Sequence, residues 1–233
     1  MRPLAIFAAT LLGTFAIIPA ALAQSTGTRI GPSPAQVPDS GYGTKDDQAR
    51  VAMYRYAECV VDSGRDRVEM YLATFPGSKA AHKSANSLAV DRCLSTGEMR
   101  FSESLFRSGV YDVLYRKKFL KDGPVDFAAI PAIDYAAGED IKANGTAQSR
   151  VVIRQIADCT VRKAPQESRV LVLSAVASKS ESTAFTQIVP AMSGCVFEGS
   201  ELNFSKSVLR GVIGEALYRL SVGASQPMIA AKD

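Results

Sequence analysis

Two stretches of the chain carry the same pattern: Phe101–Arg116 reads FSESLFRSGVYDVLYR, and Phe204–Arg219 reads FSKSVLRGVIGEALYR. Seven of their sixteen aligned positions are identical. In both stretches apolar residues recur at the i, i+4, i+8 spacing of a packed helix face, as Leu105, Gly109 and Val113 do. The sequence therefore predicts an internal duplication in which two copies of one helix bury equivalent faces. Gly211 and Gly214 in the second copy suggest a close helix–helix approach, although ordinary packing tolerance also explains them.

The four cysteines follow the same duplication. The chain reads AECVV around Cys59 and ADCTV around Cys159, and each of these cysteines has a follower, Cys93 and Cys195. An even number of cysteines in an exported chain indicates disulfides. Of the three possible pairings, the duplication favours Cys59–Cys93 and Cys159–Cys195, because a copied unit must already have been self-sufficient. By the loop-entropy model, each bridge would contribute about 3–4 kcal/mol.

The first 23 residues have the pattern of a bacterial export signal. Arg2 is followed by an almost unbroken apolar run over residues 4–18, and Ala21-Leu22-Ala23 fits cleavage before Gln24. A membrane anchor is the alternative, but the apolar run is short for a span of about 20 residues. We expect a periplasmic or secreted mature protein with no membrane span after cleavage.

The rest of the chain divides into helical units and connecting segments. We expect a disordered lead-in at 24–44, one helical unit at 45–120, a linker at 121–148, a second helical unit at 149–222 and a flexible tail at 223–233. The expected fold is all-α, with two tandem disulfide-pinned units packed as one pseudo-symmetric body.

Breaks within the first unit predict its helices. Asp46-Asp47 is expected to cap the first helix, Ser63-Gly64 to end it, and Pro76-Gly77 to end the second. A third helix is expected from Ser78 to about Leu94. In the second unit, Pro165 is suited to the first position of a helix, and a two-residue insertion is expected in the loop before it.

The linker is too apolar for a free tether. It contains four large apolar side chains, Phe127, Ile130, Ile133 and Tyr135. We therefore expect it to lie in a groove between or beside the two units.

Composition narrows the function classes. The net charge is +4, and Arg116-Lys117-Lys118 is the only basic cluster, which favours a solvated helix end over a nucleic-acid surface. The chain has no nucleophile elbow, phosphate-binding glycine loop or zinc motif, and its one histidine, His82, is expected to be exposed. We expect no catalytic residue, cofactor or metal.

One polar set recurs in the two stretches quoted first. Its members are Arg107, Asp112, Tyr115, Arg116, Arg210, Glu215, Tyr218 and Arg219. Asp112 and Arg116, and likewise Glu215 and Arg219, have the i, i+4 spacing of a helix ion pair. The set is a candidate for contacts to a ligand or partner. At 100° per residue, however, Arg107 lies about 180° from Arg116. That geometry favours exposed ion pairs on one flank, with the arginines and tyrosines anchoring neighbouring segments.

The function expected from these features is binding. Stacked helical repeats leave a concave surface for a partner, so we expect a non-enzymatic envelope protein that binds an unknown protein or small molecule. The alternative is a hydrolase or lyase acting on envelope polymers, which requires Asp112, Glu215, Tyr115 or Tyr218 to converge with other acids in a cleft. A third alternative is a stress-related structural protein without a specific ligand.

Overall fold

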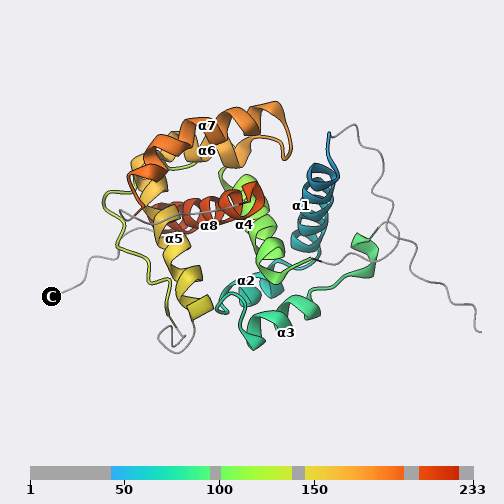
Figure 1. Cartoon of the computed structure of the whole chain (residues 1–233). Helices are drawn as coiled ribbons and strands as arrows, with labels where there is room; N and C mark the ends of the chain where they lie inside the picture. The colour runs from blue at the N-terminus through green and yellow to red at the C-terminus, as the bar shows by residue number, and fades with distance from the viewer. Residues whose placement is uncertain (1–42, 95–100, 138–144, 197–204, 226–233) are drawn as a thin grey trace, which may run out of the picture. The chain divides into compact units, whose positions relative to one another are not determined.

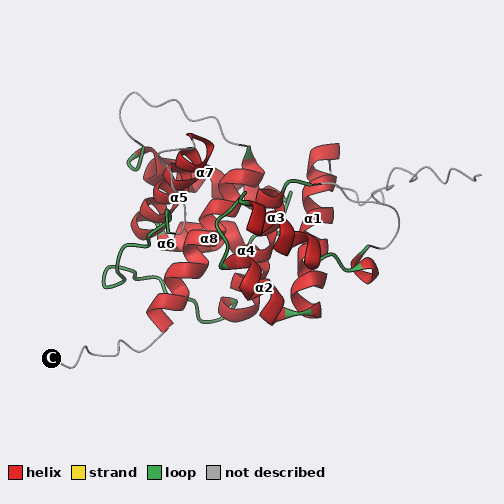
Figure 2. Cartoon of the chain, turned by 90° about the horizontal axis from the view of Figure 1, so that it is seen from below, coloured by secondary structure: helices red, strands yellow, loops and turns green. Residues whose placement is uncertain are grey.

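The fold is built from helices throughout the part of the chain that the computed structural model describes, residues 43–94, 101–137, 145–196 and 205–225. The helices are α1 (Lys45–Ser63), α2 (Arg65–Leu72), α3 (Lys79–Ser87), the short 3-10 helix η1 (Asp91–Cys93), α4 (Glu103–Phe119), α5 (Gly145–Lys163), α6 (Pro165–Leu173), α7 (Lys179–Ser193) and α8 (Lys206–Ser225). Figure 2 shows these helices joined by loops, with no strand among the described residues. The predicted all-α class is confirmed. The predicted signal peptide and the lead-in up to residue 42 lie outside the described residues.

The two halves of the chain contain their helices in the same order. The N-terminal half comprises α1–α4 and the C-terminal half α5–α8. Helices α1, α2 and α3 begin at residues 45, 65 and 79, and α5, α6 and α7 begin one hundred positions later, at 145, 165 and 179. Helix α8 begins 103 positions after α4. This order is compatible with an internal duplication.

The expected insertion before Pro165 is wrong, because α2 and α6 begin one hundred positions apart. The additional residues instead follow the start of α7, which continues for 15 residues, whereas α3 ends after nine. The expected continuous helix from Ser78 to Leu94 is therefore also wrong. Helix α3 ends at Ser87, the fully buried Leu88 follows it, and η1 then carries Cys93.

Serine and threonine side chains begin several helices. Thr44, not Asp46 or Asp47, caps α1, since its hydroxyl accepts from the Asp47 amide at 3.1 Å. Ser78 and Ser178 cap α3 and α7 in the same way. Each such cap contributes about 1 kcal/mol. At the other end of the chain α8 runs to Ser225, so residues 223–225, expected in the tail, are helical.

Helices α4 and α8 lie between α1–α3 on one side and α5–α7 on the other in both views (Figures 1 and 2). Their contact is close because α8 carries glycines there. A Cβ atom on Gly211 would lie 1.9 Å from Ser108 Oγ, and one on Gly214 would lie 2.4 Å from Asp112 Oδ1. The close approach suggested by these two glycines is confirmed.

Two apolar cores hold the helices together. One gathers side chains of α1, α2 and α4, including the fully buried Tyr71 and Phe106. The other gathers α5–α8 but also includes Tyr115 and Phe119 of α4. Complete burial of one large apolar side chain is worth about 1.5–3 kcal/mol. The core of the C-terminal half is therefore completed by the last helix of the N-terminal half.

The described part of the linker, residues 121–137, packs on the C-terminal half. Phe127 and Tyr135 are buried, and Phe127 belongs to the second core. Arg162 Nη1 on α5 donates to the carbonyl oxygens of Phe127 at 2.8 Å and Ile130 at 2.9 Å. Tyr135 donates to Asp158 Oδ2 at 3.0 Å. The apolar residues of this segment thus lie against the protein, beside the second unit.

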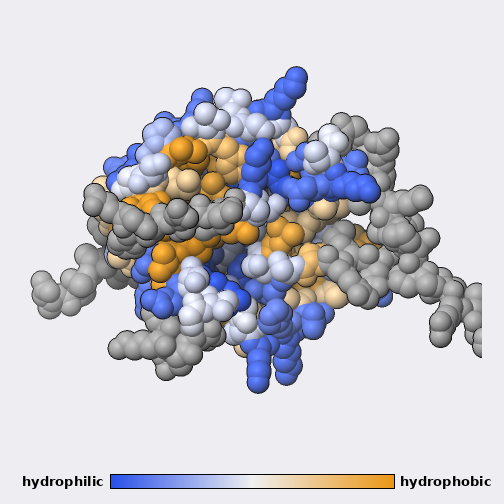
Figure 3. Space-filling view, in the orientation of Figure 1, coloured by the Kyte–Doolittle hydropathy of each residue, from blue (hydrophilic) through white to orange (hydrophobic). Residues whose placement is uncertain are grey.

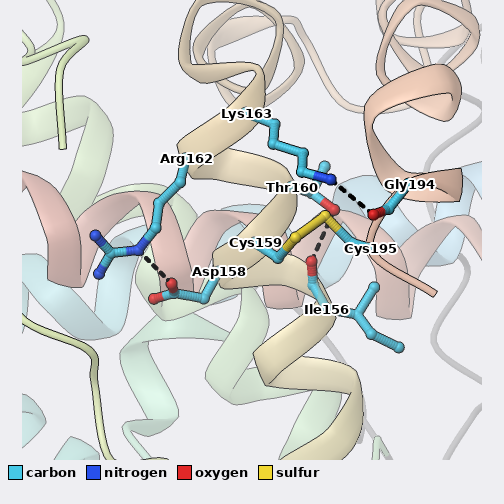
Figure 4. Close-up of a disulfide and its surroundings, with 8 residues drawn as sticks. All are labelled: Ile156, Asp158, Cys159, Thr160, Arg162, Lys163, Gly194 and Cys195. Carbon is cyan, nitrogen blue, oxygen red and sulfur yellow. Dashed lines mark hydrogen bonds and ion pairs between the residues drawn. A yellow bond between two sulfur atoms is a disulfide. The ribbon is translucent and has the colours of Figure 1, made fainter. Parts of the chain in front are cut away.

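Two disulfides join Cys59 to Cys93 and Cys159 to Cys195, the pairing that the duplication favours. Each bridge ties the first helix of its half to the segment that precedes the last helix. Figure 4 shows Lys163 of α5 beside the second bridge, donating to the Gly194 carbonyl at 2.7 Å. Neither bridge crosses from one half to the other.

Candidate functional site

Arg107 and Arg210 occupy corresponding positions on α4 and α8, and both are buried. Each guanidinium donates to backbone carbonyls in the last turn of a neighbouring short helix. The carbonyls are those of Tyr71 and Leu72 for Arg107, and of Leu171 and Val172 for Arg210. The final carbonyls of a helix carry partial negative charge and lack partners within it. These two arginines therefore anchor α2 and α6.

A buried carboxylate holds Arg107 in place. Glu103 Oε1 accepts from Arg107 Nε at 2.8 Å and from the Tyr71 hydroxyl at 2.6 Å, and Oε2 accepts from the Gly77 amide at 2.9 Å. Burial by itself would raise the pKa of Glu103, but Arg107 and these hydrogen bonds together hold it below its ordinary value.

Glu181 on α7 has the same role toward Arg210. Its carboxylate accepts from Arg210 Nη1 at 2.9 Å and from the Ala177 amide at 3.0 Å. It also accepts from Arg50 Nη2 at 2.6 Å, which reaches across from α1. Glu103 and Glu181 each accept from the arginine that anchors a short helix, but they are not at corresponding positions. The residue that corresponds to Glu181 is Ala81.

Asp112 does not form the expected ion pair with Arg116. It is buried, and its Oδ2 accepts from Arg210 Nε, while Arg116 donates to the Ser174 carbonyl. The close contact of α4 and α8 brings Arg210 within reach, so a partner on another helix replaces the one a turn away. Burial raises the pKa of Asp112, and Arg210 opposes that shift. The expectation of an exposed pair on this flank is wrong.

Glu215 is also buried and faces two arginines. Arg154 of α5 approaches it with two parallel bonds, from Nε at 2.9 Å and from Nη2 at 2.6 Å. Arg219, at the expected i, i+4 position, lies 3.4 Å from Oε1. Two-point guanidinium–carboxylate pairing is among the strongest polar contacts in proteins, so this carboxylate is held in a fixed position.

The two tyrosines of the predicted set are packing residues. Tyr115 is fully buried, and its hydroxyl accepts from Arg169 Nη1 at 2.9 Å. Tyr218 packs against both cores, with its ring 5.8 Å from that of Tyr111. Burial raises the pKa of both Tyr115 and Tyr218.

Two cavities of very different size adjoin the α4–α8 contact. The smaller, called the closed cavity because side chains leave only about 30 Å³ of it empty, is lined by Arg50, Met53, Tyr54, Leu105, Ser108, Gly109, Asp112, Val176, Ser207, Arg210 and Gly211. The open cavity, of about 520 Å³, has in its wall, in matching order, Arg150, Ile153, Arg154, Val208, Gly211, Val212, Glu215, Pro76, Ser104, Arg107 and Ser108. Every residue of the closed cavity therefore has its counterpart in the open one, at a separation of 100 or 103 positions.

The closed cavity is filled by its own side chains. Met53 reaches over Gly109, where an added Cβ would lie 2.7 Å from the Met53 methyl carbon. The counterparts in the open cavity are Ile153 and Val212, and the shorter side chain of Ile153 does not replace the long thioether. Arg50, in the wall of the closed cavity, forms an ion pair with Glu181. The closed cavity is thereby occupied by side chains of the protein, whereas the open cavity remains empty of them.

Arg150 of α5 lies in the wall of the open cavity. Its guanidinium lies over Gly77, where an added Cβ would come within 2.5–2.8 Å of it. It forms no hydrogen bond or ion pair with any residue that the structure describes. Sequence reasoning overlooked this residue, as well as Arg50, Arg154 and Glu181. The signal was present, because Arg50 and Arg150 are one hundred positions apart, at corresponding places in the two halves.

Other groups singled out in the sequence lie on the surface. His82 is exposed on α3, and Lys117 of the basic cluster pairs with Asp62 at 2.7 Å. Among the described residues, no group of three or more histidine, cysteine or acidic side chains is placed to hold a metal ion. No helix in the described ranges is long and apolar enough to cross a membrane.

Apolar surface gathers in the middle of one face of the protein, in the region where Figure 1 places α5 and α8 (Figure 3). Val208 of α8, which lines the open cavity, is 39% exposed. No protein-family model, curated protein or solved structure matches this chain.

Proposed function

We propose that the protein is exported and binds a small molecule in the open cavity without transforming it. The observation that carries this proposal is the cavity of about 520 Å³ between α4, α5 and α8. Ligand sites of soluble proteins commonly have volumes of about 300–1,000 Å³, with mainly apolar walls and a few placed polar groups. The open cavity has this composition, since Ile153, Val208 and Val212 share its wall with Arg150 and serine hydroxyls.

Export to the periplasm, or secretion, is the second part of the proposal. The apolar run over residues 4–18 and the small residues before Gln24 support a cleaved signal. The two disulfides are consistent with an oxidising compartment.

The two halves descend, in this proposal, from one duplicated helical unit. The matched helix starts support this, and so do Arg107 and Arg210, which anchor the ends of corresponding helices. The paired cavities would then be two copies of one ancestral site.

The arginine partners of the buried carboxylates Asp112 and Glu215 support binding over catalysis. A general acid or base must exchange a proton with its substrate. Asp112 and Glu215 instead face guanidinium groups, and the Tyr115 hydroxyl accepts from Arg169. A hydrolase or lyase built on these groups would first have to release them from their arginines.

Native mass spectrometry of the mature protein, purified gently from its own periplasm, tests the proposal. We expect a stoichiometric additional mass on the wild type. Val212→Trp, which fills the open cavity, should lose that mass, while Val189→Trp on the exposed side of α7 should keep it. A bare wild type, or a Val212→Trp variant that carries the same mass, would contradict binding in this cavity. Turnover of an envelope polymer by the wild type would favour the hydrolase.

A further inference from the structure

Arg150 occupies, in the open cavity, the position that Arg50 occupies in the closed one. In the closed cavity Arg50 Nη2 donates to Glu181 Oε1 at 2.6 Å, and both side chains are buried. The residue corresponding to Glu181 is Ala81, whose methyl group supplies no charge. The same guanidinium therefore meets a carboxylate in one cavity and lacks it in the other.

Glu103 does not supply the carboxylate that Arg150 lacks. Its carboxylate is bound by Arg107, by the Tyr71 hydroxyl and by the Gly77 amide. No carboxylate of the described residues lies within 4.0 Å of the Arg150 guanidinium. The cationic group on the wall is thus available to a molecule inside the cavity.

The open cavity is also the more positively charged of the two. Counting the wall and its direct ion-pair partners, the open cavity has four guanidinium groups, Arg107, Arg150, Arg154 and Arg219, against three carboxylates, Asp46, Glu103 and Glu215. The closed cavity has two, Arg50 and Arg210, against three, Asp47, Asp112 and Glu181. An excess positive charge in a partly enclosed site favours an anionic guest.

The rest of the open cavity suits an apolar body. Its wall contains Pro76, Leu105, Tyr111, Ile153, Val208 and Val212. These side chains offer no charged partner, so the favourable contribution from this part of a ligand would come from removing apolar surface from water.

We infer that the open cavity binds an anion with a largely apolar body, and that Arg150 binds its carboxylate or similar charged group. The ligand's charged group takes the place that the Glu181 carboxylate has beside Arg50. This inference deepens the proposed function and rests on it. The closed cavity, where Glu181 already pairs with Arg50 and Met53 occupies the space, does not bind the same ligand.

The experiment compares decanoate with 1-decanol, which has the same chain and no charge, by isothermal titration calorimetry at neutral pH. The protein is the mature chain with both disulfides. We expect one decanoate per chain, bound at least tenfold more tightly than decanol. Arg150→Met should weaken decanoate binding by about tenfold to a hundredfold, the effect of losing a charge-assisted hydrogen bond, and leave decanol binding unchanged. Arg55→Met, at an exposed arginine of α1, is the matched control.

A second variant installs the missing carboxylate. Ala81→Glu places an acid where the closed cavity has Glu181, and it should weaken decanoate binding as Arg150→Met does. Circular dichroism shows whether each variant is folded. If Ala81→Glu does not fold, the comparison of wild type with Arg150→Met is sufficient to test the inference.

The outcomes separate the two proposals. Equal affinity for decanoate and decanol, or an Arg150→Met variant that retains the preference for decanoate, overturns the role of Arg150. If neither probe binds while native mass spectra show a ligand that Val212→Trp loses, the anion inference fails and the proposed function stands. If the wild type is also bare in those spectra, both fail.

Discussion

Arg50 Nη2 lies 2.6 Å from Glu181 Oε1, although 131 residues separate them in the chain. The contact joins α1 of the N-terminal half to α7 of the C-terminal half. Arg210 also donates to Glu181 and to Asp112, so one buried network of alternating charge connects the two halves. Removing one member leaves its partners buried without compensation, and that cost exceeds the value of the contact itself.

Glu181→Ala should therefore destabilise the protein by about 3–5 kcal/mol. Urea unfolding monitored by circular dichroism measures the change. The control is Glu69→Ala, which removes the exposed i, i+4 pair with Arg65 and should cost less than about 1 kcal/mol. Similar losses for the two variants would mean that the buried network does not hold the halves together.

Glu103→Gln should change how stability depends on pH. The pKa of Glu103 is lowered from 4.5 in the folded protein, so its contribution is present above that pH and is lost as the pH falls through the folded value. At neutral pH we expect the variant to be less stable by about 1.5–3 kcal/mol, because hydrogen bonds to a buried charge are lost. The difference should shrink below pH 4.5 in chemical unfolding series. A difference that stays constant down to pH 3 would exclude this linkage.

The two disulfides should contribute nearly equally. Their sequence separations are 34 and 36 residues, so the entropy removed from the unfolded chain is almost the same. Replacing either pair by serine should cost about 3–4 kcal/mol in the free energy of unfolding. A cost confined to one pair would show that folded-state contacts at that bridge outweigh loop closure.

Gly211→Ala should destabilise the protein, although alanine favours a helix by about 1 kcal/mol over glycine. The added methyl group meets the Ser108 Cβ at 2.2 Å, and forcing such a contact costs about 1–3 kcal/mol. Adding Ser108→Gly removes the overlapping atoms. A double-mutant cycle should show that it recovers part of the loss. If the destabilisation by the two substitutions is instead additive, the methyl group added at position 211 does not overlap the Ser108 side chain.

Gly77→Ala and Ala177→Gly form a matched pair. Both positions have positive φ, 73° for Gly77 and 63° for Ala177, where an L side chain costs roughly 1–2 kcal/mol. Gly77→Ala should lower the thermal midpoint and also displace Arg150, which lies over this glycine. Ala177→Gly relieves the backbone and should leave the midpoint unchanged or raise it. A lower midpoint for Ala177→Gly alone would contradict this reasoning.

The helices were predictable because their signals are local. The apolar stripe through Leu105, Gly109 and Val113 and the turn at Pro76-Gly77 each depend on a few neighbouring residues. The glycines of α8 also announced a close contact, because only a missing Cβ permits it. The cap of α1 was misassigned, since Thr44 and Asp46 are both good capping residues and only the start of the helix decides between them.

The polar site was less predictable because its partners come from different helices. Asp112 has Arg116 at the correct spacing, yet the crossing of α4 and α8 offers it Arg210 instead. One part of the site was nonetheless present in the sequence. Aligning the halves at one hundred positions pairs Arg50 with Arg150 but Glu181 with Ala81, so only one of the two arginines has an acid at the corresponding position.

That single mismatch depends on both cavities belonging to one chain. In a symmetric homodimer the two equivalent sites share one sequence, so any substitution alters both together. Here positions 81 and 181 are separate residues, and one has a carboxylate where the other has a methyl group. A tandem chain can therefore dedicate one site to holding its halves together and the other to an external molecule, a division of labour that identical subunits cannot make.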